Sequence, residues 1–187
     1  METFLNMETR KHLYKNKNNF SLTRVGIISD THGFLDEKVF SYFENVDEIW
    51  HAGDFGSEVA EKLSAFKNLR GVFGNIDGKK VRDFFPLHNQ FRVEELNVWM
   101  THIGGFPPNY EPGILKKLQA HTPDIFVCGH SHILKVMRDK NLNNMLHINP
   151  GATGRSGFHI MRTIVRLEID RKKIQNVEAI ELGKRGE

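Results

Sequence analysis

Cysteine and long apolar runs are both scarce in this sequence of 187 residues. A single cysteine, Cys128, excludes an intrachain disulfide and is typical of a protein from a reducing compartment. No stretch approaches the roughly 20 apolar residues that a membrane-spanning helix needs. We therefore expect a soluble, cytoplasmic protein whose fold depends neither on disulfides nor on a membrane.

Excess positive charge is missing from most of the chain. The net charge is +3 at pH 7, and residues 1–24 account for all of it with five basic and two acidic side chains. The remaining residues balance at zero, whereas a protein that binds nucleic acid polymers needs a surplus of Lys and Arg to neutralise phosphates. A nuclease that acts on long polymers is therefore disfavoured.

The start of the chain differs in composition from the rest. Residues 1–21 are rich in Asn, Lys and Glu and contain no apolar segment of seven or more residues, so we do not expect a secretory signal. We expect residues 1–22 to form a flexible tail and residues 23–187 to form a single domain, which is long enough to bury a core without crosslinks. The alternative is a short amphipathic helix from Phe4 to Tyr14 that packs on the domain or on a second subunit of a homodimer.

Short runs of β-branched and aromatic residues indicate strands in the first two thirds of the chain. Helical signals lie between several of these runs, including Ser57 as an N-cap and Pro112 in a first turn. The predicted strands are residues 25–28, 46–50, 72–73, 96–100 and 125–127, and the predicted helices are residues 36–44, 57–67 and 112–120.

The last third of the chain changes character, because strands follow one another with few residues between them. Residues 145–149, 163–169 and 174–180 are predicted strands, and residues 170–173 are predicted to connect the last two as a hairpin. Early strands with helical connections followed by late hairpins indicate an α+β fold, in which two mixed sheets pack together and are flanked by helices.

Seven side chains that can bind metal fall in five short clusters, nearly all of which follow a predicted strand. Side chains far apart in sequence converge at the carboxyl ends of strands in such sheets. The mixture of carboxylate, amide and imidazole groups suits manganese, iron, nickel or catalytic zinc better than calcium or structural zinc. One catalytic ion takes about three or four protein ligands, so this set is large enough for two ions that share a carboxylate. The seven are Asp30, His32, Asp54, Asn75, His102, His130 and His132.

The ordered set Asp-x-His, Gly-Asp, Gly-Asn, His and Gly-His-x-His resembles that of the calcineurin-like metallophosphoesterase superfamily over nearly the whole chain. The blocks at residues 74–77 and 149–152 are most similar to those of the small bacterial and archaeal phosphodiesterases. The scaffold subunit of the retromer coat is a relative of these enzymes. The resemblance implies a four-layer αββα sandwich that binds two divalent transition metal ions, with Mn²⁺ expected first and Ni²⁺, Fe²⁺ or Zn²⁺ as alternatives.

The same resemblance implies a role for each candidate ligand. One ion would be held by Asp30, His32, Asp54 and His132, and the other by Asp54, Asn75, His102 and His130. A hydroxide between the two ions would then attack a small phosphate ester, which we expect to be a phosphodiester. No side chain is assigned as a catalytic acid or base. The alternative function is a protein-binding scaffold similar to the retromer subunit, with weak or no catalysis.

Two positions depart from the pattern of the superfamily. Ile76 stands where many members have a His, which removes a general acid that could be worth on the order of 10²- to 10⁴-fold in rate. Ile103 and Gly104 stand where the small phosphodiesterases often place a Gly and another His, so this side of the pocket is less polar. Asp77 is expected to hydrogen-bond a metal ligand. The loop at residues 106–110 either packs on the surface or forms a pocket wall.

The remaining candidate residues receive structural interpretations. Cys128 lies in an apolar strand, so burial is favoured over a nucleophilic role. His51 and His147 are expected to be buried or to support the ligands. A turn at residues 149–151 is the simplest interpretation, and its alternative is a substrate contact by Arg155. Four other histidines lack a spaced partner and are assigned to the surface or core: His12, His88, His121 and His159.

Overall fold

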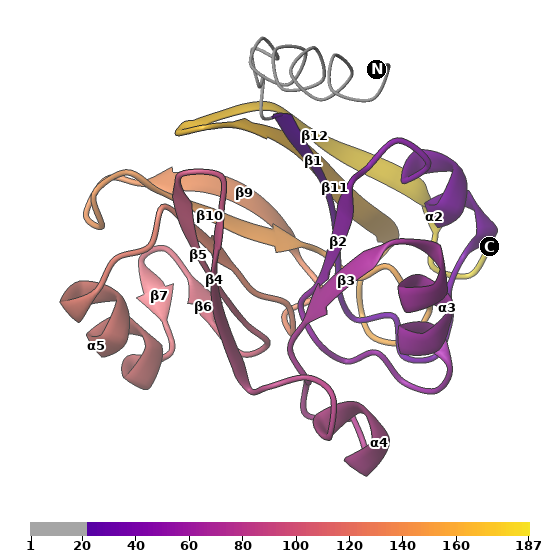
Figure 1. Cartoon of the computed structure of the whole chain (residues 1–187). Helices are drawn as coiled ribbons and strands as arrows, with labels where there is room; N and C mark the ends of the chain where they lie inside the picture. Colours follow the sequence, from indigo (N-terminus) through magenta and orange to yellow (C-terminus); the bar gives the residue numbers. More distant parts are fainter. Residues whose placement is uncertain (1–21) are drawn as a thin grey trace, which may run out of the picture.

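The computed structural model of this chain describes residues 22–187 (Figure 1). The predicted N-terminal tail and its helical alternative lie outside the described residues, apart from Leu22. This residue, which the prediction places in the tail, is the first residue of a strand and pairs with Asp170. Within residues 22–187, no helix is both long enough and apolar enough to cross a membrane.

The first sheet contains five strands, three from the start of the described chain and two from its end. They are β1 (Leu22–Ile28), β2 (Glu48–His51), β3 (Asn68–Gly71), β11 (Met161–Asp170) and β12 (Lys173–Lys184). Their order in the sheet is β12-β11-β1-β2-β3. β1, β2 and β3 run parallel to one another, whereas β11 runs antiparallel to both β1 and β12.

The second sheet also contains five strands, with three parallel strands in its centre. They are β4 (His88–Val93), β5 (Leu96–Thr101), β8 (Ile125–Val127), β9 (Leu134–Asp139) and β10 (Met145–Pro150). Their order is β4-β5-β8-β10-β9. β5, β8 and β10 are parallel, and the two edge strands are antiparallel to their neighbours.

Short elements complete the fold and cover the sheets. They are α2 (Glu37–Tyr42), α3 (Val59–Phe66), α4 (Lys79–Arg82), α5 (Pro112–Ala120) and the small hairpin of β6 (Gly105–Phe106) and β7 (Asn109–Tyr110). Figure 1 shows α2 and α3 beside the first sheet and α5 beside the second. The loop predicted over residues 106–110 is thus part of this hairpin.

The core has three apolar layers that match this arrangement. Residues such as Trp50 of β2 and Val127 of β8 pack between the two sheets. Phe43 and Leu63 pack α2 and α3 onto the outer face of the first sheet, and Leu118 packs α5 onto the second. The predicted four-layer αββα sandwich of two mixed sheets is therefore confirmed.

Two local predictions are wrong for identifiable reasons. The strand expected at residues 72–73 lies earlier, at β3, because the residues of this exposed edge strand are partly polar. Ser57 does not cap α3: the N-cap is Glu58, in a left-handed conformation with φ of 62° and with no side-chain cap bond. By contrast, Asp36 caps α2 by accepting a hydrogen bond from the backbone N–H of Lys38.

Candidate metal centre

The seven candidate ligands gather where the parallel strands of both sheets end. Asp30 follows β1, Asp54 follows β2, and His102 directly follows β5. Parallel strands deliver their carboxyl ends to the same edge of a sheet, so these loops meet across the sandwich. The side chains form two groups, and within each group all donor atoms lie within 4.8 Å of one another. One group is Asp30, His32 and His132, and the other is Asp30, Asp54 and His102.

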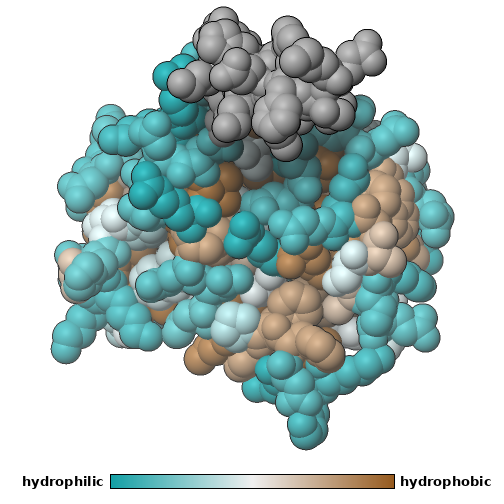
Figure 2. All heavy atoms as spheres, in the orientation of Figure 1, coloured by the Kyte–Doolittle hydropathy of each residue, from teal (hydrophilic) through white to brown (hydrophobic). Residues whose placement is uncertain are grey.

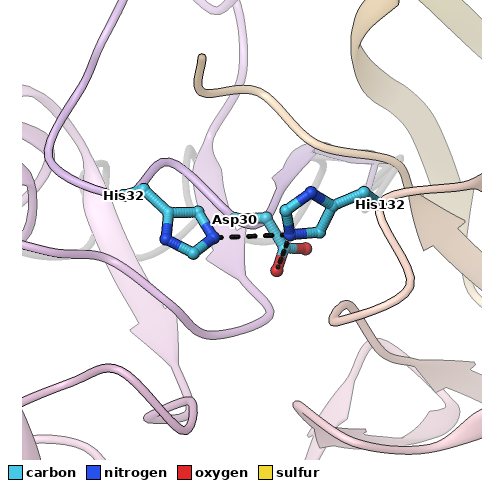
Figure 3. A group of neighbouring side chains, drawn as sticks. All are labelled: Asp30, His32 and His132. Atoms are coloured by element: carbon cyan, nitrogen blue, oxygen red, sulfur yellow. Dashed lines mark hydrogen bonds and ion pairs between the residues drawn. The ribbon is translucent and has the colours of Figure 1, made fainter. Parts of the chain in front are cut away.

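The first group brings two imidazoles to one carboxylate. Figure 3 shows the rings of His32 and His132 facing each other over Asp30. The two Nε2 atoms lie 3.3 Å apart, and His132 Nε2 is 3.2 Å from Asp30 Oδ1. His32 Nε2 is also 3.6 Å from Asp54 Oδ2. Four side chains from three loops thus point to one small space.

The second group is centred on His102. Its Nε2 atom is 3.3 Å from Asp54 Oδ2, 3.1 Å from Asn75 Oδ1 and 3.9 Å from Asp30 Oδ1. The ring of His130 lies at a centroid distance of 5.2 Å from the ring of His102. Asp54 Oδ2 therefore lies between the two groups, whereas His130 is at the margin of the second.

Hydrogen bonds orient both carboxylates. Asp54 Oδ1 accepts from the backbone N–H of Ile76 at 3.0 Å, which leaves Oδ2 facing the imidazoles. Asp30 Oδ2 accepts from the hydroxyl of Ser29 at 2.6 Å, which leaves Oδ1 facing His132. The backbone N–H of His130 donates to the carboxylate of Asp30 as well. Asp54 Oδ2 is thus directed into the centre without a backbone partner in the described part of the chain, whereas Asp30 Oδ1 faces His132 and also accepts from the N–H of His130.

His102 is held with one nitrogen available to a cation. Its Nδ1–H donates to the carbonyl of Ala52 at 2.8 Å, so in the neutral ring Nε2 is an acceptor. Burial lowers the pKa of His102, but the carboxylates of Asp54 and Asp30 outweigh it and leave the pKa raised. Burial raises the pKa of Asp54, yet the hydrogen bond and charge of His102, the N–H of Ile76 and the charge of His32 together outweigh burial and leave that pKa lowered.

The donor set fits a divalent cation. Carboxylate oxygens, an amide oxygen and imidazole nitrogens all meet here as acceptors, and adjacent acceptors such as Asp54 Oδ2 and neutral His102 Nε2 need a proton or a cation between them. The same mixture is the ligand type of transition metals. The residues present therefore fit the kind of metal ion that the sequence predicts.

The backbone at the centre is strained. Five of the seven candidate ligands have a positive φ: Asp30 at 51°, His32 at 47°, Asp54 at 56°, His130 at 68° and His132 at 59°. A residue other than glycine pays of order 1 kcal/mol or more for this conformation, and such strain concentrates at functional sites. Six other described non-glycine residues also have a positive φ, but they are spread over separate parts of the chain, whereas these five gather at one site, which supports a functional role for these loops.

The strained loops are fastened to one another. Asp30 N–H donates to the carbonyl of Gly53, and His32 N–H donates to the carbonyl of Asp54. A Cβ atom added to Gly74 would lie only 2.0 Å from Asp54 Oδ1, so any side chain at this position would displace the carboxylate. Asn149 donates to the carbonyl of Gly129 at 2.8 Å, next to His130. The predicted turn at residues 149–151 is wrong, because Asn149 and Pro150 are the last residues of β10. The end of this strand nevertheless supports a ligand loop through Asn149.

Two neighbouring residues act on the backbone. His51 is buried, and its Nδ1 accepts from the N–H of Gly53 while its Nε2 contacts the hydroxyl of Thr31. Burial lowers the pKa of His51 well below its ordinary value, so the ring is neutral. Asp77 accepts from the N–H groups of Gly56 and Gly74. Its predicted hydrogen bond to a metal ligand is therefore replaced by a clamp on two loops.

One histidine at the centre was missed by the sequence analysis. The ring of His159 lies at a centroid distance of 5.3 Å from that of His132. His159 Nε2 lies 3.0 Å from the carbonyl of Gly154, and its Nδ1 is buried with no hydrogen-bond partner among residues 22–187. No spacing in the sequence links these residues, because the loop at residues 151–160 approaches only in the folded chain.

Two other candidates have structural surroundings. Cys128 is fully buried, and burial raises the pKa of its thiol to about 12, which agrees with a packing role. Arg155 stacks over the ring of Phe34 at 4.1 Å and donates to the backbone carbonyl of Glu187. Its guanidinium is thus tied to the C-terminal end of the chain.

Comparisons with known proteins agree with this geometry. Residues 23–172 match the family model described as calcineurin-like phosphoesterase superfamily domain. A probable metallophosphoesterase of Methanothermobacter thermautotrophicus is 30% identical over 135 residues, which cover 68% of this chain and 76% of the relative. One of Methanocaldococcus jannaschii is 27% identical over 135 residues, which cover 68% and 67%.

Solved structures share the fold. An archaeal phosphodiesterase superimposes with a TM-score of 0.68 at 24% identity, covering 86% of this chain and 100% of that chain. Zinc-bound Vps29 of Entamoeba histolytica gives a TM-score of 0.67 at 15% identity, covering 87% and 99%. At these identities the likeness concerns the architecture alone.

Proposed function

Because this chain belongs to the calcineurin-like phosphoesterase superfamily, we propose that it is a metal-dependent phosphodiesterase that hydrolyses a small phosphate ester. The reaction would take place at the edge where β1, β2, β5 and β8 end. We further propose that the seven candidate ligands bind two ions, and that residues 23–187 act as one domain. The family membership supports the class of reaction, and the geometry of the described residues supports the finer assignment.

One observation carries the proposal of two ions. Asp54 Oδ2 lies 3.6 Å from His32 Nε2 on one side and 3.3 Å from His102 Nε2 on the other. A carboxylate oxygen directed at two groups of nitrogen donors is suited to bridging two cations. One ion would be held by Asp30, His32, Asp54 and His132, and the other by Asp54, Asn75, His102 and His130. Mn²⁺ is the first choice, with Ni²⁺, Fe²⁺ or Zn²⁺ as alternatives.

The ions would supply a nucleophilic water of lowered pKa and would neutralise charge on the phosphoryl oxygens. The residues of the chain hold the donors in place beforehand. Ile76 N–H and Ser29 Oγ–H each hold one carboxylate oxygen, and Ala52 O fixes the ring of His102. The lowered pKa of Asp54 keeps its carboxylate ionised at neutral pH, because its hydrogen bonds and the neighbouring histidines together outweigh burial.

A protein-binding scaffold is the alternative function. The shared fold of the Vps29 structures is compatible with it. A scaffold has no physical need for a convergent set of carboxylate and imidazole donors on strained backbone, so this set favours the enzyme. The absence of a His at position 76 fits weak catalysis on esters with poor leaving groups in either case.

The experiment is hydrolysis of bis(4-nitrophenyl) phosphate and of 4-nitrophenyl phosphate, with and without Mn²⁺. We expect Mn²⁺-dependent activity that is higher on the diester in the wild type. Asp54→Asn should lose this activity, because its amide no longer provides the anionic oxygen between the two donor groups. Asp170→Asn, in the β11–β12 hairpin, is the matched control and should keep it. Full activity of Asp54→Asn, or preference for the monoester, would contradict the proposal.

A further inference from the structure

An apolar cavity of about 530 Å³ opens between α3 and α4, beside the candidate metal centre. Its lining includes Ala60 of α3, Val81 of α4, and the side chains of Ile76, Phe84 and Phe85. Figure 2 shows hydrophobic residues in brown gathered on the visible face above α4. Cavities of roughly 300–1,000 Å³ with apolar walls are the usual form of small-ligand sites.

The cavity adjoins two of the loops that carry candidate ligands, because Gly56 and Ile76 line it and lie close in sequence to Asp54 and Asn75. Ile76 contributes to both the cavity and the candidate metal centre, since its backbone N–H holds Asp54 Oδ1 while its side chain lines the cavity. Phe85 stacks on Phe55 at a centroid distance of 4.8 Å, and Phe55 stacks on His51 at 3.6 Å. A group bonded through oxygen to a phosphorus at the centre would have this apolar cavity next to it.

The side chains that line the cavity indicate which kind of substrate group it can bind. Ile76 is 46% exposed and Phe84 is 80% exposed, so both offer apolar surface that the fold leaves uncovered. Aromatic faces such as that of Phe84 bind flat rings by stacking and edge contacts. The polar rim carries Glu58, Glu61 and Lys80, and Lys80 forms an ion pair with Glu61. This rim offers no net positive charge to a second phosphate group.

The cavity walls provide little help to a leaving group that needs a proton. Ile76 has no proton to give. The hydrogen bond with Lys80 lowers the pKa of Glu61, and the same bond raises the pKa of Lys80, so both stay charged at neutral pH. An aryl oxide leaves without a proton more readily than an alkoxide does, which agrees with a ring as the substituent.

We propose that the cavity between α3 and α4 binds a flat, uncharged ring of the substrate, so that the substrate is an aryl-type phosphodiester without a second phosphate. This inference rests on the proposed function and names its substrate class. The ring would pack against Phe84 and Ile76 while its phosphate lies at the metal centre.

The test compares the binding of phenylphosphonate and methylphosphonate to the Mn²⁺-loaded protein by calorimetry. We expect the wild type to bind phenylphosphonate more tightly. Phe84→Ser should reduce this preference by roughly threefold to tenfold, the range that a lost aromatic contact gives. Its exposed side chain makes unfolding an improbable cause of the change. Ala60→Phe, which fills the cavity, should reduce the preference without changing the affinity for methylphosphonate.

Val177→Ser is the control, since Val177 of β12 is 41% exposed and lines neither this cavity nor the one beside His130 and His132. It should keep the wild-type preference. In parallel, the KM for bis(4-nitrophenyl) phosphate should rise in Phe84→Ser and stay unchanged in Val177→Ser. If Phe84→Ser keeps the full preference while the wild type hydrolyses the diester, the cavity assignment is wrong and the proposed function stands. If the wild type hydrolyses no diester, both are overturned.

Discussion

Replacing His147 with leucine is expected to stabilise the protein in mild acid. His147 is fully buried, with ring centroids 5.9 Å from those of Tyr110 and Phe126. Neither ring nitrogen has a hydrogen-bond partner within residues 22–187. Burial, and secondarily the charge of Lys135, lower the pKa of His147 from 6.5 to about 4. The ring is therefore kept neutral in the fold where the unfolded chain would be protonated.

The size of the effect follows from the two pKa values. Between pH 6.5 and about pH 4 the folded protein binds fewer protons at His147 than the unfolded chain does. The free energy of unfolding therefore falls as the pH falls through this range, by about 2 kcal/mol at pH 5 relative to pH 7.5. For a domain of this size the loss corresponds to about 4–8 °C in Tm. Removal of two unsatisfied nitrogens should add about 1 kcal/mol at every pH.

Thermal unfolding of the wild type, His147→Leu and His121→Leu at pH 7.5, 6 and 5 measures this effect. All samples should contain EDTA, so that metal binding does not contribute to the pH dependence. We expect the gap in Tm between His147→Leu and the wild type to widen toward pH 5. His121 is exposed, and His121→Leu should follow the wild type. Parallel curves for the wild type and His147→Leu would refute the reasoning.

Three further predictions concern the centre and its support. Gly74→Ala should weaken Mn²⁺ binding at least tenfold, because its Cβ would lie 2.0 Å from Asp54 Oδ1. Gly78→Ala has open space around its Cβ and should bind Mn²⁺ as the wild type does. Equal affinities of the two variants in calorimetry would contradict this prediction. Ile76→His should raise kcat on phenyl esters more than on 4-nitrophenyl esters, by on the order of tenfold or more; an equal change on both would argue against a missing acid. Arg162→Met should cost about 3 kcal/mol of stability, because it leaves the carboxylate of a buried ion pair unpaired; an unchanged denaturation midpoint would oppose this.

The order of layers and the location of the candidate ligands could be predicted from the sequence. Runs such as residues 125–127 are continuously apolar because both faces of a central strand are covered, and polar residues directly after them must lie at the strand ends. Asp54 and His102, which lie 48 positions apart, were therefore expected at the same edge of the fold, and the family resemblance implied that they share an ion. This pattern of an apolar run followed by a polar residue is easy to detect, because burial requires the apolar run in each central strand separately.

Features that depend on contacts between loops could not be predicted. The edge strand β9 has an irregular burial pattern, so the sequence carries little signal for it. His159 reaches His132 only because the loop after β10 folds back over the centre. The cavity beside Ile76 lies between residues of α3 and α4, and no pattern in the sequence predicts how far apart these two helices lie. Positive φ values at non-glycine ligands are likewise invisible in a sequence.

The most direct test of the central claim is the number of Mn²⁺ ions bound per chain, located by anomalous diffraction from crystals of the wild type and of Asp54→Asn. The proposal of a bridged pair predicts two peaks in the wild type, one beside His32 and His132 and the other beside Asn75 and His102, with loss of at least one peak in Asp54→Asn. A single site or none in the wild type, or two undiminished sites in Asp54→Asn, would contradict it.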